Sequence, residues 1–191
     1  MIKNLLLFIA LSLSTLTYAN AQKNMPDVNA AMGILQQKMI LMPFITASID
    51  INRKLSSKDV KLYIHTRKKN NAAYRQQSKI IESQYEKAAR RLKKGVSFNT
   101  FTLKAIELSG KKTSLDKNAK LMGYEDALDL SITSSRIKRA LISIEMDRHA
   151  NIIPSVQRAM MKSMISGLMG NVSNADIRAV KPYAKELTHY K

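Results

Sequence analysis

The chain has 191 residues, a formal net charge of +18 and no cysteine. The lack of cysteine excludes disulfide bonds, thiol catalysis, cysteine-based zinc sites and lipid attachment through a cysteine. The excess of lysine and arginine predicts anionic partners, because a charge of this size creates a field that recruits anions.

The first residues are typical of a cleavable secretory signal peptide. Lys3 supplies a positive charge, and the apolar run at residues 5–13 is shorter than the roughly 20 residues that span a membrane. Ala19 and Ala21 have the small-residue spacing of a cut before Gln22. We therefore predict a signal peptide at residues 1–21 and a soluble, periplasmic mature protein at 22–191. The alternative is a retained N-terminal anchor.

Helical periodicity begins soon after the predicted cut. A first helix is expected from Pro26, with a kink at Pro43. A long helix then begins at a capping box formed by Ser56 and Asp59, and ends near Gly95.

The apolar stripe of this long helix is interrupted in its middle by Arg67 and Asn71. We expect that the helix either breaks near Asn70 or passes there through solvent. The next helices are predicted at residues 98–109 and after Thr113, which stands three residues before Asp116 as in a capping box.

The strongest amphipathic pattern follows Gly123, and its apolar positions are Ala127, Leu130, Ile137, Leu141 and Ile144. A further helix is expected at residues 151–169, and a last one is capped by Ser173 with Asp176 and interrupted or restarted at Pro182. No segment alternates as a strand does. The sequence predicts an all-α single domain of six to eight helices in an irregular bundle, preceded by the signal peptide.

Two short segments of the chain form a recognisable pattern. The first is Gly123-Tyr124 followed by Asp129, Arg136-Ile137, Ala140 and residues 144–147, and the second is the run at residues 55–60. Together they resemble a family of exported, all-helical bacterial proteins of unknown function. The family usually has an aromatic residue near positions 128–130, where this chain has none. The resemblance implies an all-helical periplasmic domain and brings no catalytic residue to this chain.

Residues 53–120 form a basic segment, with nineteen lysines and arginines against five acids. Its densest part is a cluster of five cations that we expect to bind an anionic partner: Lys87, Arg90, Arg91, Lys93 and Lys94. Envelope polymers, lipid head groups and acidic proteins are such partners outside the cytoplasm. The alternative is a solvated helical surface whose lysine content has no binding role.

Two further groups of residues have both a structural and a functional interpretation. Asp129, Arg136 and Arg139 are expected to form an Asp129–Arg136 ion pair between helices, because a buried arginine needs a partner, or else an anion pocket. The methionines are expected to fill the core, to bind copper(I), or to form an adaptable apolar face for a partner. The methionines proposed for that face are Met39, Met42, Met160, Met161 and Met164.

No catalytic constellation, metal site or cofactor motif is predicted. The Ser-x-x-Lys pattern recurs in this serine- and lysine-rich chain without its companion motifs. We therefore predict a non-enzymatic periplasmic binding or adaptor protein, chaperone-like, with an anionic envelope component or protein client as its partner. The alternative is a small helical enzyme with an arginine- and lysine-lined site. Peripheral membrane contact is compatible with the charge, no stable nucleic-acid partner is expected, and the sequence does not indicate an oligomeric state.

Overall fold

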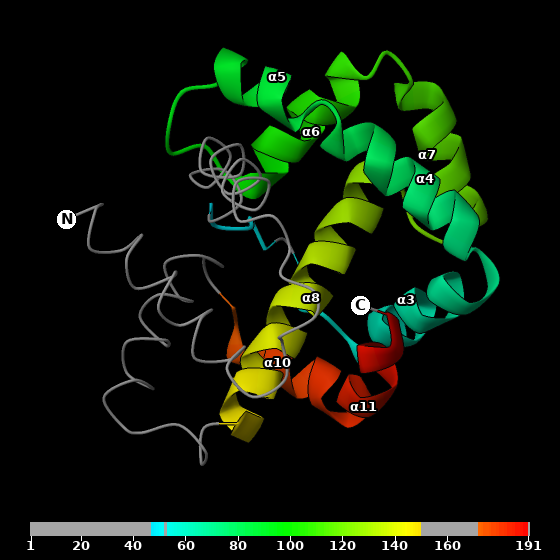
Figure 1. Ribbon diagram of the computed structural model, residues 1–191, viewed down its shortest axis with the longest axis vertical. Coiled ribbons are helices and arrows are strands. Elements are labelled where there is room, and N and C mark those ends of the chain that lie inside the picture. The colour runs from blue at the N-terminus through cyan, green and yellow to red at the C-terminus, as the bar shows by residue number, and fades with distance from the viewer. Residues whose placement is uncertain (1–46, 52, 150–171, 191) are drawn as a thin grey trace, which may run out of the picture. The chain divides into compact units, whose positions relative to one another are not determined.

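The computed structural model describes residues 47–51, 53–149 and 172–190, and within these ranges the chain is helical and contains no strand (Figure 1). All of these residues lie in the second of two compact units, which is formed by residues 40–191. The all-α class is therefore confirmed for the described residues. The predicted signal peptide and the predicted helices near Pro26 and at 151–169 lie outside them.

From α3 to α8 the helices follow one another with short connections. Their bounds are α3 Ser57–Lys69, α4 Asn71–Glu82, α5 Tyr85–Arg91, α6 Phe98–Leu108, α7 Lys112–Leu121, α8 Ala127–His149, α10 Asn174–Val180, the 3-10 turn η1 Lys181–Tyr183, α11 Ala184–Leu187, and η2 Thr188–Tyr190.

The predicted long helix is divided into α3, α4 and α5. Its start is confirmed, since the Ser56 hydroxyl accepts a hydrogen bond from the Asp59 backbone N–H and the Asp59 carboxylate accepts one from the Ser56 backbone N–H. The break at Asn70, one of the two expected alternatives, is present. A second interruption at Ser83 and Gln84 was not predicted, because neither residue is a strong helix breaker.

The expected capping box at Thr113 is wrong. α7 begins at Lys112, and its N-cap residue Lys111 makes no capping hydrogen bond with its side chain. The Asp116 carboxylate instead accepts a hydrogen bond of 3.1 Å from the Ala127 backbone N–H and pairs with Lys112 at 2.6 Å. Asp116 thus fastens the first turn of α8 to α7 rather than capping its own helix.

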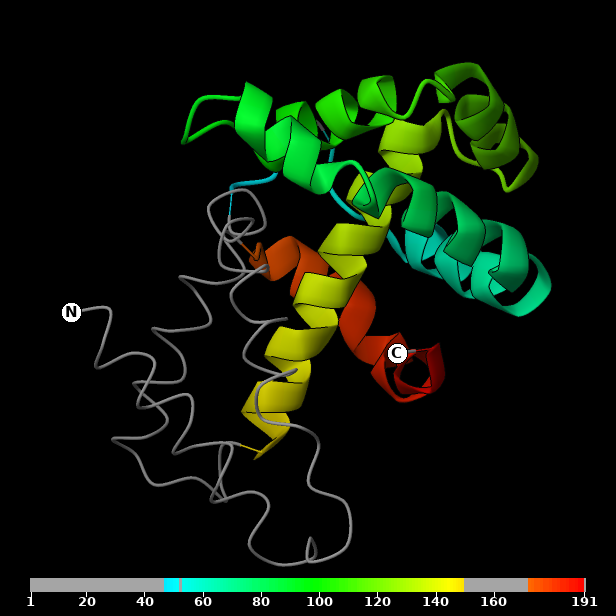
Figure 2. The same ribbon diagram turned by 45° about the horizontal axis from the view of Figure 1, so that its top comes forward.

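α8 is the helix on which most of the others pack (Figures 1 and 2). It contacts α6 and α7 toward its N-terminal end, and α3, α10 and α11 further along. The predicted apolar seam is confirmed, because all five of its residues are buried: Ala127, Leu130, Ile137, Leu141 and Ile144. One apolar cluster joins α8 to α3, α4 and the C-terminal helices, and a second joins its first turn to α4, α5, α6 and α7.

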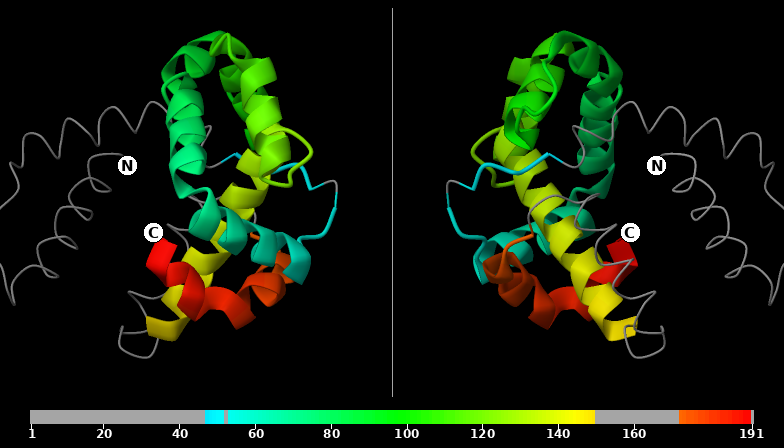
Figure 3. Two further views of the ribbon diagram at one scale, coloured as in Figure 1. Left: turned by 90° about the vertical axis from the view of Figure 1, so that its right-hand side faces the viewer. Right: turned by 90° about the vertical axis from the view of Figure 1, so that its left-hand side faces the viewer.

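The C-terminal segment begins as expected. The Ser173 hydroxyl caps α10 by accepting a 3.0 Å hydrogen bond from the Asp176 backbone N–H. Pro182 lies within η1, which separates α10 from α11. Figure 3 shows this segment, in red, beside α8 and α3, where Val180, Ala184 and Leu187 are buried.

Gly123 between α7 and α8 is a position where we expect a substitution to be costly. Its φ is +93°, and a Cβ atom there would lie 3.0 Å from Cδ1 of Leu62. We expect Gly123→Ala to lower the free energy of unfolding by about 1–3 kcal/mol, measured by urea denaturation. Gly95→Ala is the matched control, because Gly95 has a φ of +88° with no atom within 4 Å of the added Cβ. Equal losses in the two variants would show that the contact with Leu62 does not matter.

Candidate anion-binding groove

A cavity of about 590 Å³ lies between α3, α4, α8 and the C-terminal residues. This volume is within the range of small-molecule sites. We call it the Arg67 groove. Its lining residues are Tyr63, Arg67, Tyr74, Arg75, Ser78, Lys79, Glu82, Ile137, Lys138, Leu141, Ile142, Leu187 and Tyr190.

Arg67, in the third turn of α3, is the buried cation of this groove, with only 6% of its surface exposed. Its Nη1 donates a 2.9 Å hydrogen bond to the Tyr63 hydroxyl, and its Nε donates one of 3.2 Å to Oδ1 of Asn71. No carboxylate in the described ranges forms an ion pair with it. Burial of a charge without a counter-ion is costly, so an anion entering the groove finds a cation that has lost much of its hydration.

Three tyrosine rings surround the Arg67 guanidinium. Its central carbon lies 5.8 Å from the ring centroid of Tyr63, 4.8 Å from that of Tyr74 and 5.7 Å from that of Tyr190. The rings of Tyr63 and Tyr74 meet edge to face at 5.8 Å. These cation–π contacts offset part of the cost of burying the charge, and they leave its full positive charge in place.

The hydroxyl groups of the two inner tyrosines differ in acidity. Burial raises the pKa of Tyr63. Burial also acts to raise the pKa of Tyr74, but the positive charge of Lys138 and polar contacts with Ser134 and Tyr63 outweigh it, so this pKa lies below its ordinary value. The Tyr74 ring thus lies close to the positive charge of Lys138, whose Nζ is 5.8 Å from the ring centroid.

The outer part of the groove combines positive charge with apolar surface. Arg75, Lys79 and Lys138 are exposed, and Glu82 is the single acidic residue among the described residues that line the groove. Ile142 on α8 is 45% exposed. A ligand that matches these walls carries an anionic group and an apolar or aromatic body.

The basic cluster predicted from the sequence lies elsewhere. Lys87, Arg90, Arg91, Lys93 and Lys94 are all exposed on α5 and in the residues after it, and α5 packs against α6. Arg90 forms an ion pair with Glu86. We call these five residues the basic surface, and none of them lines the Arg67 groove.

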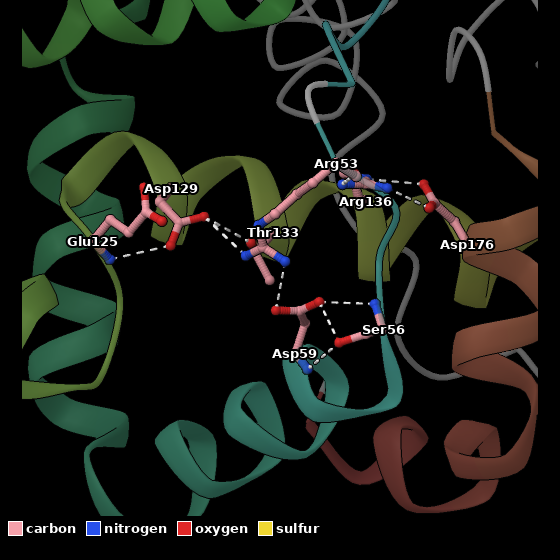
Figure 4. A network of polar contacts seen from close by, with 8 residues as sticks. All are labelled: Arg53, Ser56, Asp59, Glu125, Asp129, Thr133, Arg136 and Asp176. Atoms are coloured by element: carbon pink, nitrogen blue, oxygen red, sulfur yellow. Dashed lines mark hydrogen bonds and ion pairs between the residues drawn. The ribbon is translucent and has the colours of Figure 1, made fainter.

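Arg136 has a different partner from the one predicted. Its Nη2 and Nε donate hydrogen bonds of 2.6 and 3.0 Å to the two carboxylate oxygens of Asp176, which is 2% exposed (Figure 4). The Asp129–Arg136 pair is therefore wrong. The two residues share α8, and seven residues along a helix span about 10 Å, too far for an ion pair.

Asp129 belongs to a neighbouring part of the same network. It accepts a 3.2 Å hydrogen bond from the Glu125 backbone N–H, and it lies 3.5 Å from Nη2 of Arg53, whose Nη1 is 2.8 Å from Asp59 (Figure 4). Nη1 of Arg136 donates a 2.8 Å hydrogen bond to the Arg53 carbonyl. The polar residues of the two segments that carried the family resemblance thus meet around Arg53, where they join α3, α8 and α10.

Burial acts to raise the pKa of Asp59 in this network. Hydrogen bonds from Ser56 and Arg53 outweigh that effect and hold the pKa below its usual value.

Arg139 lies apart from Arg136. Its guanidinium lies 5.1 Å from the ring centroid of Phe98, and its Nη1 donates a 3.2 Å hydrogen bond to the Ala47 carbonyl. Burial lowers its pKa to about 10. Neither arginine lines the Arg67 groove.

The methionine positions considered for a partner face lie outside the described residues. Those positions are Met39, Met42, Met160, Met161 and Met164. Within the described ranges no three His, Asp or Glu side chains are grouped as metal ligands, and none of the helices there is both long and apolar enough to span a membrane.

Comparison of the chain with models of known families, with curated proteins and with solved structures finds no match. Sequence reasoning missed Arg67, although Tyr63 stands one helical turn before it and so shares its face of α3.

Proposed function

We propose that this protein is a non-enzymatic binding protein that holds an anion with an apolar body in the Arg67 groove. The observation that carries the proposal is the position of Arg67, a buried guanidinium in the wall of a ligand-sized cavity with no carboxylate partner among the described residues. A hydrogen bond to a charged group contributes about 1.5–3 kcal/mol, which is enough to make the anionic group the main determinant of affinity.

The distribution of charge favours binding over catalysis. Electrostatic catalysis needs several fixed donors around the reacting atoms in a site that excludes water. In the groove Arg67 is buried, whereas Arg75, Lys79 and Lys138 are exposed and hydrated. The enzyme with an arginine- and lysine-lined site therefore remains the second interpretation of the same cavity.

The basic surface supports a second binding role, recruitment to an anionic component of the envelope. All five side chains are exposed, and Arg90 alone has a carboxylate partner within the described ranges. Such a surface attracts anions over about 8 Å at physiological salt. We also propose a periplasmic location, because residues 1–21 resemble a signal peptide. A protein client is a further proposal, based on methionines that lie outside the described residues.

The proposed function is tested by titrating the protein with 3-phenylpropanoate, a carboxylate with an aromatic body, in a calorimeter. Arg67→Gln is expected to weaken binding by about 10- to 150-fold, because it removes a charged hydrogen bond worth about 1.5–3 kcal/mol. The melting temperature should not fall much, because the change also removes a buried charge that lacks a carboxylate partner in the described structure.

The matched control is Arg178→Gln, which removes the same charge from an exposed position on α10. This variant should bind as the unchanged protein does. Absence of binding to the unchanged protein, or equal binding by Arg67→Gln, would contradict the proposal.

A further inference from the structure

A second cavity, of about 40 Å³, lies between α4 and α8 beside the Arg67 groove. It shares Tyr74, Ser78, Glu82 and Lys138 with the groove, so the two spaces are neighbours. We call it the Gln77 recess. Its volume exceeds the space of a single water molecule and is enough for a polar group of a few atoms.

One buried polar side chain of this recess, that of Gln77, has no hydrogen-bond partner among the described residues. Gln77 on α4 is 2% exposed, and both its amide nitrogen and its amide oxygen have no hydrogen-bond partner in the described structure. The Oγ atom of Ser134, on the facing side of α8, is also buried at this recess and lies beside the Tyr74 hydroxyl. Most buried polar groups in proteins are paired, so a donor and an acceptor left together at one cavity indicate a ligand.

The chemistry of Gln77 specifies the complementary group. A primary amide offers two N–H donors and one carbonyl acceptor at a fixed separation. A secondary amide of a ligand presents the matching acceptor and donor. A carboxylate or an ether has acceptors but no donor. The recess therefore fits an amide rather than a second anionic group.

The spacing between the recess and Arg67 restricts the ligand further. Tyr74 lines both spaces, its ring lies 4.8 Å from the Arg67 guanidinium carbon, and Lys138 and Ser134 face its hydroxyl. Because the two spaces share Tyr74 and three further lining residues, a ligand that reaches both sites carries its carboxylate and its amide close together. An N-acylated amino acid has this arrangement, and its side chain supplies the apolar body.

We propose that the Gln77 recess is a specificity subsite that binds the amide of an N-acylated amino acid whose carboxylate is held by Arg67. The inference rests on the proposed function, since it assigns the ligand class of the same groove. It assigns Gln77 the recognition of the ligand's amide, whereas Arg67 attracts the ligand's negative charge.

The test compares two probes that differ only in an acetamido group, N-acetyl-L-phenylalanine and 3-phenylpropanoate. The unchanged protein should bind N-acetyl-L-phenylalanine about tenfold more tightly, the effect of one or two buried hydrogen bonds. Gln77→Leu should remove this preference and leave the affinity for 3-phenylpropanoate unchanged within about twofold. Because the Gln77 amide has no hydrogen-bond partner among the described residues, the melting temperature of Gln77→Leu should be unchanged or raised.

Ser134→Ala is the second variant, because it removes a hydroxyl from the facing wall with a smaller change of volume. It should reduce the preference in part. Equal affinities for the two probes in the unchanged protein, with binding still dependent on Arg67, would overturn the recess as a subsite and leave water as its occupant. A preference retained by Gln77→Leu would also overturn it. If neither probe binds, the proposed function fails together with this inference.

Discussion

Replacing Asp176 with alanine is expected to lower the free energy of unfolding by about 3–5 kcal/mol. Arg136 is 5% exposed, and the replacement leaves its guanidinium buried without the carboxylate that accepts two of its hydrogen bonds. The Asp176 backbone N–H still reaches the Ser173 hydroxyl, so the cap of α10 is preserved. Urea denaturation followed by circular dichroism measures the loss.

Two controls separate the cost of an unpaired charge from other effects. Asp129→Ala removes a partly exposed carboxylate whose ion pair with Arg53 spans 3.5 Å, and we expect a loss of about 1 kcal/mol or less. Arg136→Met combined with Asp176→Leu removes both charges and should recover most of the stability. A loss for Asp176→Ala no larger than that for Asp129→Ala would show that the buried pair contributes little.

The second large effect is expected at the basic surface. Replacing Arg90, Arg91, Lys93 and Lys94 with glutamine should weaken binding to anionic vesicles by about 1,000-fold, because each basic residue near such a surface contributes about 1 kcal/mol. Binding by the unchanged protein should also weaken steeply as salt rises to physiological strength. Co-sedimentation with vesicles of defined anionic lipid content measures both effects.

The matched control removes four exposed lysines from other helices, namely Lys58, Lys61, Lys181 and Lys185. This variant has the same net charge and should lose much less binding. Both variants should keep the melting temperature of the unchanged protein, because exposed ion pairs such as Glu86–Arg90 contribute little to stability. Equal losses in the two variants, or equal binding to neutral vesicles, would show that the basic surface is not a specific binding site for anionic lipid.

The parts of the fold that the sequence predicted depend on neighbours close along the chain. Ser56 and Ser173 cap their helices because each hydroxyl needs only a backbone N–H three residues later. The apolar seam of α8 is buried because a stripe of this period requires a packing partner, whichever helix supplies it. Thr113 has the same local pattern as the two serines, but the Asp116 carboxylate bonds instead to the backbone of Ala127, which no local rule predicts.

The buried ion pair and the candidate site were harder to predict because the parts of each come from distant positions. Arg136 and Asp176 are separated by 40 residues, and Asp129 was only the nearest acid on the same helix. Arg67 interrupts an apolar stripe, which suggested a break or a solvent-exposed turn. Its burial depends on the rings of Tyr74 and Tyr190 as well as on Tyr63 one turn before it. Whether a charged residue in an apolar stripe lies in water or among aromatic rings is decided by tertiary packing.

Because several helices form the wall of the Arg67 groove, ligand binding should be detectable by thermal unfolding. α3, α4, α8 and the C-terminal residues each contribute to that wall, so unfolding takes the groove apart and any ligand shifts the equilibrium toward the folded state. A ligand at 100 times its Kd stabilises a protein by about 2.7 kcal/mol, which raises the Tm of a chain of this size by several degrees. A library of amphipathic carboxylates can therefore be screened by melting curves without an assay of activity. The Arg67→Gln variant is measured in parallel. A compound that raises the Tm of this variant as much as that of the unchanged protein binds at a site other than the Arg67 groove.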